Sequence, residues 1–210
     1  MKKLIIIILF TFVGFAYSQD VEVKTGSGKI VILHDNGTWE YKIIEKINTE
    51  NLDINCDYYK NEIDDFTGDE KLWTKSIKFG KTKLGSNVKF QFRATKSKGN
   101  NIIAISFTGF GDIGCVSQMS STAKLKFSDG EFIELTHFGN TDCGDYLEFM
   151  SILHSSDDAL GELIIDEEDW EKFNTLKIEM IRIQGSEYYT DVIIDDDKQD
   201  YILKHLNCVK

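Results

Sequence analysis

The sequence has no apolar run long enough to cross a bilayer. Its longest run, from Leu4 to Ala16, spans 13 residues, whereas a membrane-spanning helix needs about 20. Two lysines precede the run, and Ala16-Tyr17-Ser18 places small residues where a signal-peptide cleavage site requires them. The pattern therefore predicts a signal peptide over residues 1–18, cleavage before Gln19, and a mature chain without a membrane span.

The sequence is also poor in basic residues. It contains 24 Lys and Arg against 35 Asp and Glu, a formal net charge of −11, and cleavage would remove Lys2 and Lys3 as well. Proteins that bind nucleic acid neutralise phosphates with Lys and Arg, so this balance argues against a nucleic-acid partner and against an anionic membrane face. Cations, neutral glycans and basic protein surfaces remain compatible partners.

No Cys-x-x-Cys is present, which removes the spacing of a thioredoxin-like redox pair and of a zinc knuckle. The four cysteines all follow the predicted signal peptide, and an even number in an oxidising compartment favours two disulfides. Of the three possible pairings we favour Cys115 with Cys143, because a hairpin between them would bring their loops together. Cys56 with Cys208 would then join the start of the main domain to its end. The alternative is that one or both pairs stay reduced.

Short strands with turn residues between them make up most of the chain. Residues 19–45 predict a three-strand β-meander, in which Asp35-Asn36-Gly37 is a strong hairpin signal. Residues 46–57 are polar and without periodicity, and we interpret them as a linker. Residues 58–210 predict an antiparallel β-sandwich-like domain. Its alternating segments indicate strands at 88–94, 103–107, 123–127, 133–135, 147–153, 160–165, 176–183 and 188–194.

Two helices interrupt the strands. Asp166 can cap a short helix that carries Trp170 and Phe173 on one face. Asp197 can cap a C-terminal helix, in which an apolar stripe precedes Cys208. The stripe consists of Tyr201, Ile202, His205 and Leu206. The fold class that we expect is therefore mostly β, with a short N-terminal meander and a C-terminal helix.

The stretch from Gly109 to Gly114 matches G-x-G-x-x-G after a predicted strand. A dinucleotide fingerprint needs a helix that opens at the third glycine and presents its amides to a pyrophosphate. Here Cys115 to Thr122 is rich in serine and leads into another strand. We therefore reject dinucleotide binding, expect no cofactor of that class, and interpret the stretch as a loop beside a disulfide.

Two acidic clusters could hold a hard cation. Asp195, Asp196 and Asp197, with Asp191 and Asp200 nearby, would suit Ca²⁺, which prefers several oxygen ligands. The spacing of an EF-hand is absent, and the simpler interpretation is that these carboxylates favour the N-terminus of the last helix. The second cluster surrounds Thr67-Gly68, has a composition typical of solvated loops, and consists of Glu62, Asp64, Asp65, Asp69 and Glu70.

No catalytic constellation is recognisable. None of the four histidines lies in a known frame, and these are His34, His137, His154 and His205. His137 lies near Asp142 and Cys143, which permits a Cys-His or zinc site, but a disulfide would consume the thiol. The sequence therefore names no catalytic residue.

Aromatic pairs offer a possible ligand-binding surface. Tyr188 and Tyr189 could stack on a sugar, as exposed rings do in glycan-binding modules, although aromatic residues in strands mostly fill the core or form cross-strand pairs. If both lie in a strand, one ring should face inward and the other outward. The exposed ring is then the candidate for glycan contact.

Two segments resemble known sequences. Residues 35–41 (DNGTWEY) and 61–68 (NEIDDFTG) are similar to segments of small exported proteins of unknown function from Bacteroidetes-type bacteria, and the Ser18-Gln19 junction resembles their cleavage sites. The resemblance implies export and supplies no catalytic residue. We therefore expect a periplasmic or secreted protein that binds a partner or serves as a structural component of the cell envelope. A glycan-binding module, an inhibitor or immunity-type partner protein, and a hydrolase are the alternatives.

Overall fold

A computed structural model describes residues 20–26, 29–44, 46–47, 54–78, 81–82, 90–97, 102–119 and 122–210. The predicted signal peptide and much of the predicted linker lie outside the described residues. The chain divides into two compact units, one ending at Ile43 and the other running from Ile44 to Lys210. No helix within the described ranges combines the length and the apolar character that crossing a membrane requires.

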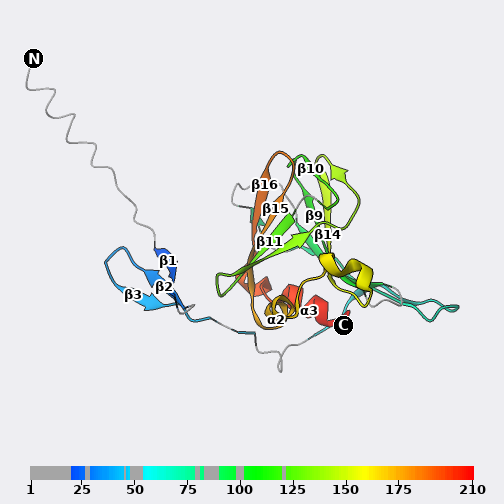
Figure 1. Ribbon diagram of the computed structural model, residues 1–210, viewed down its shortest axis with the longest axis horizontal. Helices are drawn as coiled ribbons and strands as arrows, with labels where there is room; N and C mark the ends of the chain where they lie inside the picture. Colours follow the sequence, from blue (N-terminus) through cyan, green and yellow to red (C-terminus); the bar gives the residue numbers. More distant parts are fainter. Residues whose placement is uncertain are drawn as a thin grey trace, which may run out of the picture. The chain divides into compact units, whose positions relative to one another are not determined.

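The N-terminal unit is the predicted antiparallel meander (Figure 1). Its strands are β1 (Val21–Lys24), β2 (Ile30–Leu33) and β3 (Trp39–Tyr41). The β2–β3 turn forms because Asn36 Oδ1 accepts a hydrogen bond from the Thr38 N–H at 2.8 Å while Gly37 adopts a φ of +82°. The hairpin predicted at Asp35-Asn36-Gly37 is therefore confirmed, with a positive φ at Gly37 but not at Asn36.

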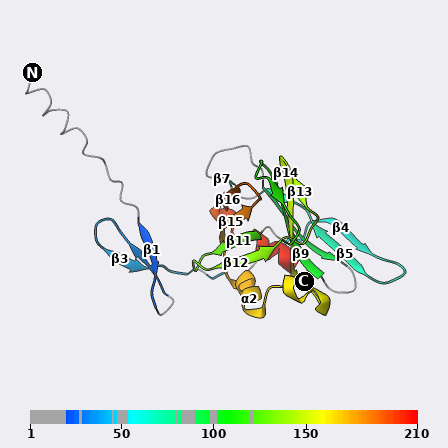
Figure 2. The same cartoon turned by 45° about the horizontal axis from the view of Figure 1, so that its top comes forward.

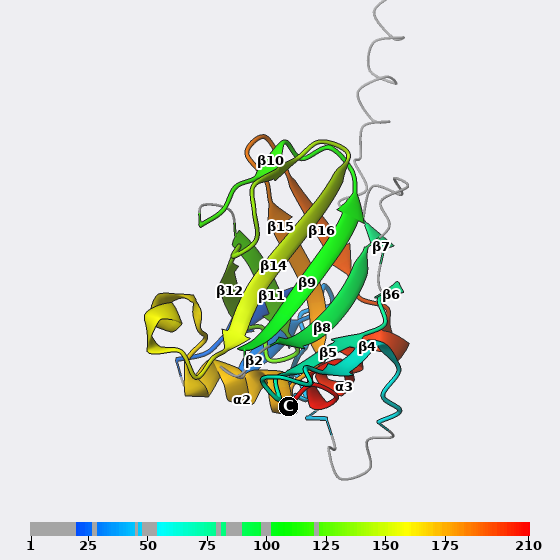
Figure 3. The same cartoon turned by 90° about the vertical axis from the view of Figure 1, so that its right-hand side faces the viewer.

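The main unit consists of two antiparallel sheets that pack face to face (Figure 3). The first has the order β14-β9-β8-β5-β4, with β6 also paired to β8, and the second has the order β12-β11-β15-β16-β7. The first sheet contains β4 (Tyr58–Ile63), β5 (Glu70–Thr74), β6 (Ile77–Lys78), β8 (Gln91–Ser97), β9 (Ile102–Phe110) and β14 (Tyr146–His154). The second contains β7 (Lys81–Thr82), β11 (Thr122–Phe127), β12 (Phe132–Thr136), β15 (Ile178–Gln184) and β16 (Tyr189–Ile193). A short pair, β10 (Cys115–Val116) and β13 (Asp142–Cys143), lies outside both sheets.

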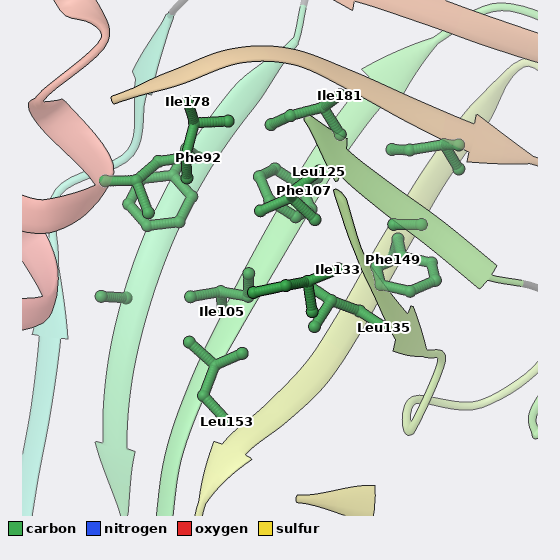
Figure 4. Close-up of a cluster of buried hydrophobic side chains, with 14 of the residues drawn as sticks. Phe92, Ile105, Phe107, Leu125, Ile133, Leu135, Phe149, Leu153, Ile178 and Ile181 are labelled. Atoms are coloured by element: carbon green, nitrogen blue, oxygen red, sulfur yellow. The ribbon is translucent and has the colours of Figure 1, made fainter. Parts of the chain in front are cut away.

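The core lies between the two sheets. Burial alternates along the whole of β11 and at the start of β8, where Phe92 and Ala94 are buried, as the alternation of apolar and polar residues predicts. In the central strand β9 every residue from Ile103 to Phe107 is buried. Phe92 and Phe107 from the first sheet meet Leu125 and Ile181 from the second (Figure 4), and each of these side chains is at most 1% exposed. The predicted β-sandwich-like fold is therefore confirmed.

The helix predicted after Asp166 is present as α2 (Glu167–Thr175). The Asp166 carboxylate accepts a hydrogen bond from the Asp169 N–H at 2.8 Å, which is the expected N-cap bond. Phe173 is buried and packs edge-on against Phe127, with ring centroids 5.5 Å apart. This helix thus joins the second sheet through the face that the sequence indicated.

The C-terminal helix is present as α3 (Tyr201–Asn207), but its predicted cap is wrong. Asp197 lies inside a 3₁₀ turn, η3 (Asp196–Lys198), and the residue at the N-cap position is Asp200. Asp195 precedes η3 and Asp200 precedes α3, and neither element receives a side-chain cap bond. Within α3, Ile202, Leu203 and Leu206 are buried.

The strand predicted over residues 160–165 is also wrong. This segment is a 3₁₀ helix, η2 (Asp158–Leu163). The carboxylate of Asp157 accepts a hydrogen bond from the Ala159 N–H at 3.0 Å, and Ser155 Oγ accepts one from the Asp157 N–H at 2.9 Å. Such local bonds compete with sheet pairing, which the alternation of apolar residues alone does not reveal.

The hairpin of β4 and β5 was not predicted, although it forms one edge of the first sheet (Figure 2). Its turn contains the second acidic cluster. The Asp64 carboxylate accepts hydrogen bonds from the Thr67 and Phe66 N–H groups, at 2.9 and 3.0 Å, and these bonds lower the pKa of Asp64. Gly68 closes the turn with a φ of +71°. The acidic residues that suggested a loop therefore build a tight turn.

Candidate functional site

A pocket of about 360 Å³ lies between the two sheets at the end of the sandwich where β9 and β15 finish and β14 and β16 begin. Its walls are residues that are almost fully buried, namely Phe90, Phe107, Gly109, Ile113, Val116, Leu147, Phe149 and Ile183. Its mouth consists of the more exposed residues Gly111, Asp112, Tyr188, Tyr189 and Thr190. The site is thus an apolar cavity with a small polar rim.

Two loops lie over the pocket and are joined by hydrogen bonds: residues 111–114 after β9, and residues 185–188 between β15 and β16. We call them the roof loops. The carbonyl oxygen of Ile113 accepts hydrogen bonds from the Glu187 and Tyr188 N–H groups, at 3.1 and 3.3 Å. The Ser186 N–H donates to the Cys115 carbonyl at 2.9 Å, and Ser186 Oγ accepts from the Cys115 N–H at 2.8 Å. The loop after β9 and the loop between β15 and β16 are therefore held together as one structure.

Two glycines permit this close approach. A Cβ at Gly185 would overlap the carbonyl group of Ile113, and a Cβ at Gly114 would overlap Ser186 Oγ. Gly114 also has a φ of +86°, which L-residues with a side chain rarely adopt. Gly114, the last glycine of the G-x-G-x-x-G stretch, consequently serves packing, and β10 follows it in place of the helix that dinucleotide binding needs.

A disulfide joins Cys115 to Cys143 directly beside this roof. The two cysteines are register partners in the β10–β13 pair, and the Gly111 N–H donates to the Asp145 carbonyl at 2.8 Å. The third strand of the region, β14, begins at Tyr146. The disulfide therefore connects the roof loop to the segment that leads into β14, the strand that supplies Leu147 and Phe149 to the pocket wall.

The second disulfide joins Cys56 to Cys208, so both bonds follow the pairing that we favoured from the sequence. Cys208 is the C-cap residue of α3, and its carbonyl oxygen accepts a hydrogen bond from the Tyr58 hydroxyl at 2.8 Å. This bond fixes the last helix to the first strand of the main unit. None of these residues lines the pocket.

Both tyrosines that the sequence suggested for ligand binding lie at the pocket mouth. Tyr188 precedes β16 and is 65% exposed, and Tyr189 begins the strand and is 55% exposed, so neither ring faces inward. The Arg182 guanidinium lies 4.1 Å from the centre of the Tyr189 ring and forms a bidentate pair with Asp191, at 2.6 and 2.8 Å. This pair raises the pKa of Arg182 and holds the ring of Tyr189 against the guanidinium.

Asp112 is the one carboxylate among the described lining residues. Its Oδ1 accepts a hydrogen bond from the Gly114 N–H at 3.0 Å, and its side chain is exposed. No other residue of the described lining carries a full charge at neutral pH. Among the described residues of the mouth, the charge is therefore the negative charge of Asp112.

The structure does not bring the predicted calcium ligands together. Asp191 is paired with Arg182, Asp195 with Lys198 at 3.6 Å, and Asp200 with Lys204 at 2.8 Å. Asp196 accepts a hydrogen bond from Gln199, and Asp197 is exposed. In the described part of the chain no group of three or more His, Cys, Asp or Glu side chains is placed to share a metal ion.

Each of the four histidines is engaged by neighbouring residues of the fold. His137 is buried, its Nδ1 accepts a hydrogen bond from the Met150 N–H at 3.0 Å, and its Nε2 lies 2.9 Å from the Asn140 carbonyl oxygen. Because both ring nitrogens are engaged and Cys143 is in a disulfide, a Cys-His site is not formed here. His34 lies near Asp20 and Glu40, His154 lies beside Trp170, and His205 is half-buried on α3.

The sequence contained two parts of the site without showing that they meet. The glycine-rich stretch and the Tyr188-Tyr189 pair are more than 70 residues apart and follow strands of different sheets. The packing of the two sheets and the hydrogen bonds that Ile113 accepts bring them to one end. The buried phenylalanines of the wall gave no signal beyond that of an ordinary core. Comparisons with protein-family models, with curated proteins and with solved structures found no match to this chain.

Proposed function

We propose that the protein is an exported binding protein that holds a small, largely apolar molecule in the pocket between its sheets and does not transform it. The pocket itself carries the proposal. Its walls are buried aromatic and aliphatic residues, its rim has a few polar groups, and its roof is fixed by hydrogen bonds and a disulfide. Cavities of this size and composition are typical of small-molecule sites.

Two further observations support the proposal. The signal-peptide pattern fits export, and two disulfides suit an oxidising compartment. The described lining contains no histidine, cysteine, lysine or serine, and its one carboxylate, Asp112, accepts the Gly114 N–H and has no described histidine or lysine beside it in the lining. The described residues of the pocket are therefore sufficient for a binding role.

The test uses the mature, oxidised protein and 4-phenyl-1-butanol, a neutral probe with an apolar body. Binding to the folded state should raise the unfolding midpoint, and titration calorimetry should give a one-to-one complex. In the variant Gly109→Val the new side chain would extend toward the Phe90 ring, which an added Cβ would approach to 3.1 Å. Valine suits a strand residue, so we expect a folded variant that binds the probe at least about tenfold more weakly.

Gly161→Val is the matched control, because a Cβ at Gly161 meets nothing within 4 Å and the residue lies in η2. It should bind the probe as the wild type does. Equal binding by wild type and Gly109→Val would remove the pocket as the site. A midpoint that rises with a glycan pool and not with the probe would favour the glycan-binding alternative instead.

A further inference from the structure

We infer that the ligand of this pocket is an organic cation, with an apolar body between the sheets and an ammonium-type group at the mouth. The inference rests on the proposed function, since it assigns the chemical class of the molecule that the pocket holds. Three features lead to it: the sign of the charge at the described rim, the aromatic residues of the lining, and the pairing of Arg182, whose guanidinium lies against the Tyr189 ring.

The charge at the rim is negative. Asp112 is exposed and uses Oδ1 to accept the Gly114 N–H, and a carboxylate has lone pairs left for a further donor. Glu187, also exposed, lies in the roof loop next to Tyr188. The described lining offers no Lys, Arg or His to an anionic group. On a chain with a formal net charge of −11, an anionic ligand would be repelled and a cationic one attracted.

The aromatic lining suits a cation as well. Three buried phenylalanines, Phe90, Phe107 and Phe149, line the pocket, and Tyr188 and Tyr189 lie at its mouth. The face of an aromatic ring attracts a cation, and Arg182 already occupies such a position 4.1 Å from the Tyr189 ring. The Tyr188 ring, 65% exposed at the mouth, is placed to contact the charged group of a ligand whose body lies against the buried phenylalanines.

Arg182 does not reverse the charge at the rim. Its guanidinium forms two hydrogen bonds with Asp191, so the pair is neutral, and neither residue lines the pocket. An incoming carboxylate would have to compete with Asp191 for this guanidinium. The described residues therefore provide a partner for a cation and no free partner for an anion.

The experiment compares three probes with the same body and different charge. These are 4-phenylbutylamine, 4-phenyl-1-butanol and 4-phenylbutyrate, titrated into the mature, oxidised protein at neutral pH. We expect the amine to bind about fivefold or more tightly than the carboxylate, with the alcohol between them. Because the rim is exposed, this preference should shrink between about 0.02 and about 0.5 M salt, while binding of the alcohol should not weaken.

Asp112→Asn tests the rim directly. Asparagine keeps an oxygen for the Gly114 N–H and removes the charge, so binding of the amine should fall to that of the alcohol. Asp129→Asn is the matched control, since Asp129 Oδ1 accepts the Glu131 N–H in the same way, at 2.9 Å, in a turn that does not line the pocket. It should leave all three affinities unchanged.

The outcomes separate the two proposals. If none of the probes binds, the proposed function fails and the inference with it. If the three bind equally, or the carboxylate binds most tightly, the pocket is a binding site but the inference is wrong. A preference for the amine that persists in Asp112→Asn would also contradict it, because Asp112 would then not be the group that receives the cation.

Discussion

At the scale of single residues, Gly185 shows how strongly the pocket roof depends on backbone contact. Gly185→Ala would place a Cβ on the carbonyl group of Ile113, which is backbone and cannot rotate away. We expect this substitution to lower the free energy of unfolding by about 2 kcal/mol or more and to weaken probe binding, because the two roof loops must separate. Urea denaturation and titration calorimetry measure the two effects.

Gly161→Ala provides the comparison at this scale, because the added methyl group meets nothing within 4 Å. Its free energy of unfolding should stay within about 0.5 kcal/mol of the wild type. If Gly185→Ala behaves in the same way, the two loops are not held together as tightly as the hydrogen bonds at Ile113 imply.

At the scale of elements, α3 links stability to pH through His205. Its ring packs edge-on against Phe92, with centroids 5.6 Å apart, and burial at this interface lowers the pKa of His205 from its ordinary value of 6.5. The unfolded chain therefore takes up a proton first as the pH falls through about 6.5. The free energy of unfolding should decrease from that pH down to the folded-state pKa, below which this contribution stays constant.

The variant His205→Gln isolates this contribution. It has no imidazole to titrate, so its unfolding midpoint should change less between about pH 7.5 and about pH 5 than that of the wild type. His34, His137 and His154 are present in both proteins, so any contribution that they make to the pH dependence of the midpoint cancels in the comparison. Identical slopes would show that burial on α3 does not oppose protonation of His205.

The elements also show what could be predicted from the sequence. Strands such as β8, β9 and β11 followed from strict alternation, and α2 followed from the cap at Asp166, because each signal is local. The segment over residues 160–165 was misassigned because the bonds of Asp157 and Ser155 outweigh its alternation. The pocket could not be predicted, since its glycines and tyrosines meet only through the packing of the two sheets and the hydrogen bonds between their loops.

At the scale of the whole molecule, the two disulfides act at different ends of the main unit. Cys115–Cys143 lies at the pocket end, near β10, and Cys56–Cys208 lies near the C-terminal helix (Figure 1). Their sequence separations are 28 and 152 residues. On chain entropy alone, their removal should lower the free energy of unfolding by about 4 and about 5 kcal/mol respectively. The effects of removing each disulfide on the ligand affinity of the pocket should differ far more.

We expect the double variant Cys115→Ala, Cys143→Ala to lose at least about fivefold in affinity for 4-phenyl-1-butanol, because the roof loop is then no longer joined to the segment that leads into β14. The double variant Cys56→Ala, Cys208→Ala should keep the wild-type affinity under conditions where it is folded, since neither cysteine touches the pocket. Titration calorimetry at a temperature well below both unfolding midpoints separates affinity from stability. If both variants lose affinity alike, the pocket depends on the stability of the whole sandwich. If only the first does, the disulfide at the roof pre-organises the site.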